Sequence, residues 1–292
     1  MISSLSVAYT KFIDLHTSFV GGAIYAQSSG FVLTVEKCMF YNCIANSYTK
    51  SHGRADPVPM SGGAIFFEGA GNSLLFTAFR SCSGSDYGQA AFIYNPGNKM
   101  CLIDCCSAES CKTSNPQGGS DIQIDYSGVL YTNGNSSNSI SNQYHVALTF
   151  SYNLENASVR FYTLSHCSGQ ILFHGGFYST GTSSSHIIFN NNSITTGLID
   201  VWNENHDIYY ATMVGNKGPI GSSRCAAFRL FNCICDTAYS GVQVPTFSST
   251  FNYLEATIPV FTNMCFVSQQ TIDIRRSPKI DQLTMVLLLY IQ

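Results

Sequence analysis

Charged side chains are scarce in this sequence: Asp, Glu, Lys and Arg together make up 11% of its 292 residues. A typical soluble domain has about 25%. Surface helices draw their solvent-facing positions largely from these residues, and no long window combines a helical apolar period with a helix cap. The net charge of -3 gives no electrostatic footprint for nucleic acid, whose binding needs a clustered basic face. We therefore expect an all-β protein without a nucleic-acid partner.

Long apolar runs are also lacking. The start at Met1 has neither the charged beginning nor the apolar core of a secretory signal peptide. The apolar run at 285–291 is far shorter than the roughly 20 residues that span a membrane. We expect the chain to be part of a longer protein and to meet a membrane only through an anchor outside these residues.

Two glycine pairs stand out among what is present. Gly21 and Gly22 begin Gly-Gly-Ala-Ile-Tyr, and Gly62 and Gly63 begin the near copy Gly-Gly-Ala-Ile-Phe. Glycine takes positive φ at little cost, so a glycine pair before an apolar run predicts a tight bend that enters a strand. Two copies in one chain indicate a structural repeat.

A second repeated pattern places an apolar residue three positions before Cys or Asn. It ends at Cys43, Cys82, Cys106, Cys167, Asn192, Asn216 and Cys233. The distances 82 to 106 and 192 to 216 are 24 residues, and 167 to 192 is 25. This spacing fits one turn of a solenoid. We therefore predict that these seven residues form a single column.

The predicted fold is a right-handed parallel β-helix with about three short strands per coil, forming one domain over 1–292. Polar, Pro-rich residues at 47–60 and Gly/Asn/Ser-rich residues at 127–143 predict two excursions from the coils. A β-sandwich is the competing fold, because it also consists of many short strands joined by turns.

The twelve cysteines allow two interpretations. Most fit stacked, buried free thiols, since a buried cysteine behaves as a small apolar residue. Some disulfides remain an open alternative, as in secreted proteins. The densest group lacks the paired Cys-x-x-Cys spacing of a zinc site and predicts no metal; it consists of Cys101, Cys105, Cys106 and Cys111.

These motifs resemble a known family. Gly-Gly-Ala-Ile with a nearby Phe-x-x-Asn, intact at Phe189–Asn192 and present as Phe-x-x-Cys at Phe40–Cys43 and Phe79–Cys82, is similar to the repeat of the chlamydial polymorphic outer membrane proteins. The cysteine-rich positions look more like the related surface proteins of trichomonad-type protists. The resemblance implies a β-helix displayed outside the cell, with a role in adhesion.

Parallel β-helices also include polysaccharide lyases and glycoside hydrolases, so a pectate-lyase-like enzyme is the alternative function. Asp104, Asp121 and Asp125 are candidate calcium ligands, and Arg80 is a candidate base. Ordinary turn and strand-face carboxylates explain the same residues. The Gly-His-Gly and Arg-x-Lys motifs of the hydrolases are missing.

Three weaker candidates remain. The stretch 202–207 joins Trp, His and acids and is a candidate sugar site, although a polar turn with one aromatic ring resting on the coil is the favoured interpretation. His166 and His174 flank Cys167 without an orienting acid. Asn135, Asn156 and Asn191 begin N-glycosylation motifs.

Taken together, the sequence predicts a non-enzymatic, cell-surface or secreted β-helix without cofactor or metal. We expect the two excursions to present a binding surface to a host-cell protein or glycan, because binding residues concentrate on loops held by a rigid scaffold.

Overall fold

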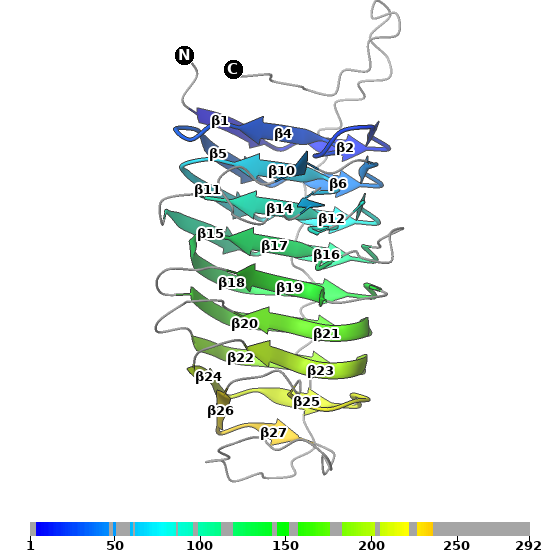
Figure 1. The fold of residues 1–292 in the computed structure, drawn as a ribbon, viewed down its shortest axis with the longest axis vertical. Coiled ribbons are helices and arrows are strands. Elements are labelled where there is room, and N and C mark those ends of the chain that lie inside the picture. Colours follow the sequence, from blue (N-terminus) through cyan, green and yellow to red (C-terminus); the bar gives the residue numbers. More distant parts are fainter. Residues whose placement is uncertain are drawn as a thin grey trace, which may run out of the picture.

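The computed structural model describes residues 4–46, 49–50, 59–60, 62–85, 87–95, 99–111, 119–141, 145–151, 157–175, 183–201, 205–221 and 227–235. Within these residues the chain is all-β, with no helix. Figure 1 shows the coils stacked along the long axis of the molecule, from β1 at one end to β27 at the other. Each described strand pair is parallel except β8–β9. The predicted parallel β-helix is confirmed, and opposed antiparallel layers are excluded for this part of the chain.

Each coil contributes strands to two large sheets. The first wall of the 15-stranded sheet contains β1 (Ser4–Ala8), β5 (Val32–Glu36), β11 (Gly71–Leu75), β15 (Met100–Asp104), β18 (Gly128–Ser137), β20 (Ala157–Ser165), β22 (Ser183–Asn190), β24 (Asn205–Tyr209) and β26 (Ala227–Phe231). Its second wall contains β2 (Lys11–Ile13), β6 (Met39–Tyr41), β12 (Ala78–Arg80), β16 (Ser107–Glu109), β25 (Thr212–Val214), β27 (Ile234–Cys235) and the second halves of β18, β20 and β22.

The 7-stranded sheet faces these walls across the core. It contains β4 (Ile24–Gln27), β10 (Ile65–Glu68), β14 (Ala91–Tyr94), β17 (Ile122–Asp125), β19 (His145–Ser151), β21 (Ser168–Gly175) and β23 (Ser193–Val201). A 3-stranded sheet of β3 (His16–Thr17), β7 (Ile44–Ala45) and β13 (Ser83–Gly84) closes part of the third side. The prediction of about three strands per coil is therefore confirmed.

The core is built from ladders of equivalent side chains. Phe12, Phe40 and Phe79 stack through three successive coils, with ring centroids 4.8 and 5.1 Å apart. Parallel strands are spaced about 4.8 Å apart, so equivalent rings meet face to face. Burying each such side chain contributes roughly 1.5–3 kcal/mol, which is how short strands are held in a long stack.

The glycine pairs form the corner that enters the 7-stranded sheet, as the sequence predicts. Gly21 and Gly62 have φ of 69° and 61°. The Gly22 N–H donates to the Gly63 carbonyl at 2.9 Å, so the two motifs stack in register. A Cβ on Gly63 would lie 2.0 Å from the Gln89 carbonyl oxygen. The second glycine is therefore needed for close approach of adjacent coils.

Over its described residues, 127–141, the predicted excursion at 127–143 is wrong. Residues Gly128–Ser137 form β18, which pairs with β15, β16 and β20. The small residues serve packing instead: a Cβ on Gly134 would lie 2.4 Å from the Tyr162 ring. Asn133 and Asn138 supply positive φ at two bends. The Gly, Asn and Ser residues that predict a loop here are instead needed at two crowded corners of one coil.

The predicted excursion at 47–60 lies mostly outside the described residues. Its described ends, β8 (Thr49–Lys50) and β9 (Pro59–Met60), pair with each other in an antiparallel ladder. This ladder forms a separate 2-stranded sheet, so these four residues stand apart from the parallel coils.

Candidate functional site

Every complete coil bends twice through a tight left-handed corner. At the first corner, between the two walls of the 15-stranded sheet, the residue with positive φ is Tyr9, Lys37, Phe76, Cys105, Asn133, Phe161, His186, Tyr210 or Asn232. At the second corner, which follows the second wall, it is Asp14, Asn42, Ser81, Ser110, Asn138, His166, Asn191 or Gly215. From Lys37 onward, the residue that follows each of these corner residues is buried wherever its burial is described.

The predicted single column is therefore two columns. Cys43, Cys82, Cys111, Ser139, Cys167, Asn192 and Asn216 follow the second corner, whereas Cys38, Cys106 and Cys233 follow the first. Cys106 and Cys233 thus do not stack with Cys43. At both corners, the inward-facing corner residue comes three positions after an inward-facing residue of the preceding strand. The apolar-x-x-Cys/Asn spacing can therefore occur twice in each coil. The coil from Cys82 ends at Cys111, 29 residues on, and not at Cys106.

A small hydrogen-bond donor suits these inward positions. The single Cys106 S–H is shared between the Asp104 carbonyl, two residues earlier, and the Leu74 carbonyl of the preceding coil, which lie 3.4 and 3.3 Å from Sγ. Asn192 Nδ2 donates to the Leu164 carbonyl at 2.9 Å in the same way. Cys, Ser and Asn are all donors of suitable size, which explains why they alternate in the second-corner column from Cys43 to Asn216. The first-corner column is more varied and also contains Gly134, Tyr162, Ile187 and Ala211.

The asparagines also form the predicted ladder. Asn192 Nδ2 donates to Asn216 Oδ1 at 2.9 Å, and the Cys167 N–H donates to Asn192 Oδ1 at 2.9 Å. Because each amide bridges two coils, the ladder satisfies buried backbone groups that would otherwise cost about 1–3 kcal/mol each.

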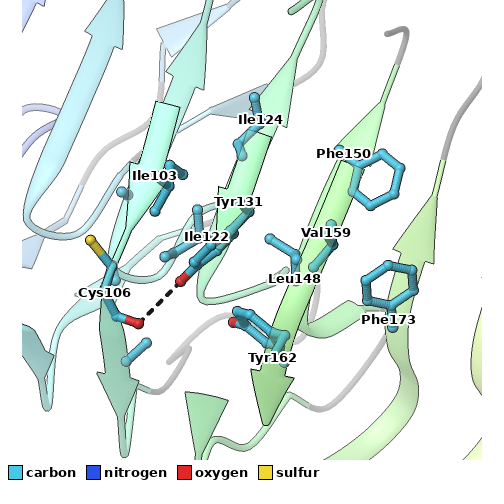
Figure 2. Packing of buried hydrophobic residues seen from close by; sticks show 14 of the residues in the cluster. Ile103, Cys106, Ile122, Ile124, Tyr131, Leu148, Phe150, Val159, Tyr162 and Phe173 are labelled. Carbon is cyan, nitrogen blue, oxygen red and sulfur yellow. Dashed lines mark hydrogen bonds between the residues drawn. The ribbon is translucent and has the colours of Figure 1, made fainter. Parts of the chain in front are cut away.

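A polar cluster lies inside the core at the middle of the stack. Asp121 is fully buried and accepts a 2.8 Å hydrogen bond from Ser139 Oγ on its Oδ2. Ser136 Oγ and the Tyr162 hydroxyl lie 2.8 Å apart, and the Tyr131 hydroxyl donates to the Cys106 carbonyl at 3.4 Å. Figure 2 shows Tyr131 and Tyr162 amid apolar side chains from several strands. Burial raises the pKa of Asp121 well above its ordinary value, because an enclosed site disfavours the charged carboxylate.

A second buried polar pair lies further along the stack. His206 is fully buried, and its Nε2 lies 2.9 Å from Ser184 Oγ. The rings of Phe150 and Phe173 are 6.2 and 6.0 Å from the imidazole centroid. Burial lowers the pKa of His206 to about 4, so the imidazole is neutral near pH 7. A neutral, enclosed imidazole serves packing in this site.

Exposed aromatic side chains line the outside of the first corner. We name this set the aromatic ridge: Tyr9, Phe76, Phe161, His186 and Tyr210. Three of them form a ladder, with Phe161–His186 centroids 4.7 Å apart and His186–Tyr210 centroids 5.1 Å apart. Tyr210 is 52% exposed despite its size. Sequence patterns alone do not identify these five positions as a group, although each lies immediately before the residue that ends the first corner.

The structure separates the candidate calcium ligands. Asp121 lies in the core, whereas Asp104 is half-buried and accepts hydrogen bonds from Thr132 and Asn133 at 2.6 and 2.9 Å. Asp125 lies on the face of β17 opposite Ile122 and Ile124, and Arg80 pairs with Glu109 at 3.4 Å. These four residues do not converge on one site. Among the residues that the structure describes, no three potential ligands are grouped to hold a metal.

The other sequence candidates are also dispersed. Trp202 and its two following residues lie outside the described residues, and Asp207 pairs with Arg229 at 2.6 Å. His166 is exposed at a second corner, Cys167 is buried, and the His174 side chain is outside the described part. Of the glycosylation motifs, Asn191 is exposed, Asn135 is half-buried in β18, and Asn156 is not among the described residues.

Comparison with protein-family models, curated proteins and solved structures finds no match. A search of the described residues finds no helix of the length and apolar character needed to cross a membrane. The site is therefore interpreted from its geometry.

Proposed function

We propose that this protein is a non-enzymatic adhesion scaffold, displayed at a cell surface or secreted, and that the aromatic ridge is its contact surface. The resemblance of the Gly-Gly-Ala-Ile and Phe-x-x-Asn motifs to surface-displayed β-helix proteins supports the location. The partner would be a host-cell surface protein or glycan. The enzyme alternative has no specific support, because its candidate carboxylates do not converge.

The observation that supports this proposal most directly is that aromatic residues occupy exposed corner positions with a strained backbone. Phe76, Phe161 and Tyr210 have φ of 49°, 55° and 57°. A bulky side chain in this region costs about 1–3 kcal/mol, and such strain is concentrated at functional sites. Asn133 and Asn232 show that asparagine, which adopts this conformation more readily, is accommodated at equivalent corners. Exposed aromatic rings are typical of surfaces that bind partners.

The rigid stack gives the ridge a fixed geometry. The Phe161 and Tyr210 N–H groups belong to a backbone held by neighbouring coils, as in the 2.8 Å bond from Tyr210 N to the Phe231 carbonyl. Arg160 is exposed next to Phe161 on the same wall, whereas the Arg229 guanidinium is paired with Asp207. Aromatic and guanidinium groups are enriched in interface cores, so this combination favours direct contact with a partner.

The test replaces Phe161, His186 and Tyr210 together by Asn, which keeps the backbone conformation. Binding of the full chain to host cells is measured by flow cytometry, with thermal unfolding as a check on the fold. We expect at least a tenfold loss of binding with an unfolding midpoint that is not lowered, because asparagine relieves backbone strain at these corners. The matched control is His166→Asn, an exposed histidine with φ of 56° at the second corner. Equal binding by the triple variant would exclude the ridge, and no binding by the unaltered chain would exclude adhesion.

A further inference from the structure

Three cysteines occupy the same position in three consecutive coils. Ser83 pairs with Ile44, and Arg80 pairs with Glu109, which places Cys82 between Cys43 and Cys111 in the second-corner column. Adjacent parallel strands are about 4.8 Å apart. Disulfide-linked Cα atoms are usually about 4.4–6.8 Å apart. The backbone spacing of neighbouring coils therefore permits a disulfide in this column.

The other buried corner cysteines have no such neighbours among the described residues of their columns. Cys38 lies between Thr10 and Thr77, and Cys167 lies between Ser139 and Asn192. Cys106 is followed in its column by Gly134. The three stacked thiols are thus distinct from the single thiols elsewhere in the described coils.

Position distinguishes the middle thiol. Cys82 has a cysteine in the coil on each side, whereas Cys43 and Cys111 each have one such neighbour. In the closed coils the S–H groups donate to backbone carbonyls: Cys43 to Phe12, Cys82 to Phe40 and Cys111 to Glu109. The central sulfur is therefore the one that can bond to either neighbour, and its thiolate is the nucleophile in disulfide exchange.

We propose that this column is a disulfide-forming site, in which Cys82 bonds to Cys43 or to Cys111 and the third cysteine stays a thiol. In the first step the Cys82 thiolate attacks a low-molecular-weight disulfide such as oxidised glutathione and releases one thiolate. The neighbouring cysteine, after losing its proton to solvent, then attacks Cys82 Sγ and releases the second thiolate. Two protein thiols are oxidised, and one small disulfide is reduced to two thiols.

All three sulfurs are buried, with side chains 0–1% exposed. The exchange therefore takes place while the coils are still open during folding. Once the coils close, the bond joins two turns of the solenoid and restricts their separation. The Cys–Cys link and the remaining thiol are then protected from further exchange.

The experiment refolds the reduced full chain from urea into a buffer of reduced and oxidised glutathione. Free thiols are then blocked with N-ethylmaleimide in urea, and the unreduced protein is digested with trypsin for mass spectrometry. Cys82 is the sole cysteine of the tryptic peptide 81–99, whereas Cys43 falls in 38–50 and Cys111 in 100–112. We expect peptide 81–99 to be recovered joined to one of these two. Recovery of 81–99 with a blocked thiol, or joined to any other peptide, would overturn the proposal.

Single variants provide the matched controls. Cys43→Ala should move the link entirely to peptide 100–112, and Cys111→Ala should move it entirely to 38–50. Cys106→Ala, which removes a buried cysteine from the other column, should leave the pattern unchanged. A link from 81–99 to 100–112 that persists in Cys111→Ala would also contradict the assignment. None of these readouts involves cell binding, so the result is independent of the proposed adhesion.

Discussion

Ser139 and Asp121 join two sides of the solenoid through a 2.8 Å hydrogen bond between fully buried groups. Ser139 belongs to the second-corner column after β18, whereas Asp121 immediately precedes β17 in the 7-stranded sheet. The carboxyl follows Cys111 in the same coil, and a negative charge on it would raise the pKa of the Cys111 thiol. This contact places an ionisable group where an apolar side chain is the usual choice.

The first prediction concerns Asp121→Asn. Burial raises the pKa of Asp121 in the folded chain, while the unfolded chain keeps a value of about 3.9. The stability that the protonated carboxyl contributes is complete below about pH 4 and decreases as pH rises toward the folded value. We expect the variant to unfold at a higher urea concentration than the unaltered chain at pH 7, with little difference near pH 3.5.

The control is Asp14→Asn, because Asp14 is an exposed carboxyl at a second corner. Its effect should stay within about 0.5 kcal/mol at both pH values. Lower stability of Asp121→Asn at pH 7 would mean that the carboxyl is charged and paired in the folded state.

The second prediction concerns acid stability. Burial lowers the pKa of His206 to about 4, below the value of about 6.5 expected in the unfolded chain. Stability is therefore lost as pH falls from about 6.5 to 4, by about 3 kcal/mol in total. His206→Gln should reduce this loss, as measured by urea midpoints at pH 7.5, 5.5 and 4.5. The exposed His186→Gln should keep the full acid dependence, and an equal loss in His206→Gln would contradict the assignment.

The third prediction tests the donor requirement at the corners. Asn192→Val removes the amide that bonds the Leu164 carbonyl and accepts from the Cys167 N–H. Leaving these groups unpaired in the core should cost about 2–4 kcal/mol in the free energy of unfolding. Asn192→Cys introduces the donor used at Cys167 in the same column, so its loss should be smaller. Equal stability of the Val and Cys variants would show that size alone matters.

The sequence predicts the coil because its strongest signals are local. Gly21 and Gly62 recur with the same following residues, and both form the same bend. The asparagines at 192 and 216 likewise stack as predicted. The register between coils is harder to predict from the sequence. Cys106 and Cys111 lie five residues apart, and both follow a left-handed corner. Only the pairing of strands tells which of them continues the column from Cys82.

The composition of β18 illustrates the second limit. Gly134, Ser136 and Ser139 are turn-forming residues in isolation, yet they are required here by the Tyr131 and Tyr162 rings and by Asp121. Such contacts join residues 18 to 28 positions apart. A reading by local propensity therefore predicts a loop where long-range packing makes a strand. The aromatic ridge cannot be predicted from local sequence for the same reason: its residues become neighbours only when the coils stack.

The fourth prediction concerns the second glycine of each repeated pair. A Cβ at Gly63 would lie 2.0 Å from the Gln89 carbonyl oxygen and within 2.8 Å of the Ser83 backbone nitrogen. These are backbone atoms of adjacent strands and corners, so neither side can rotate away. Gly63→Ala should therefore cost about 1–3 kcal/mol or more in the free energy of unfolding. Gly30→Ala is the matched control, since no heavy atom lies within 4 Å of its added Cβ. A comparison of the two urea midpoints tests this close approach. Equal midpoints would mean that the coils are further apart at this corner than the 3.0 Å hydrogen bond from the Gly63 N–H to the Gly88 carbonyl requires.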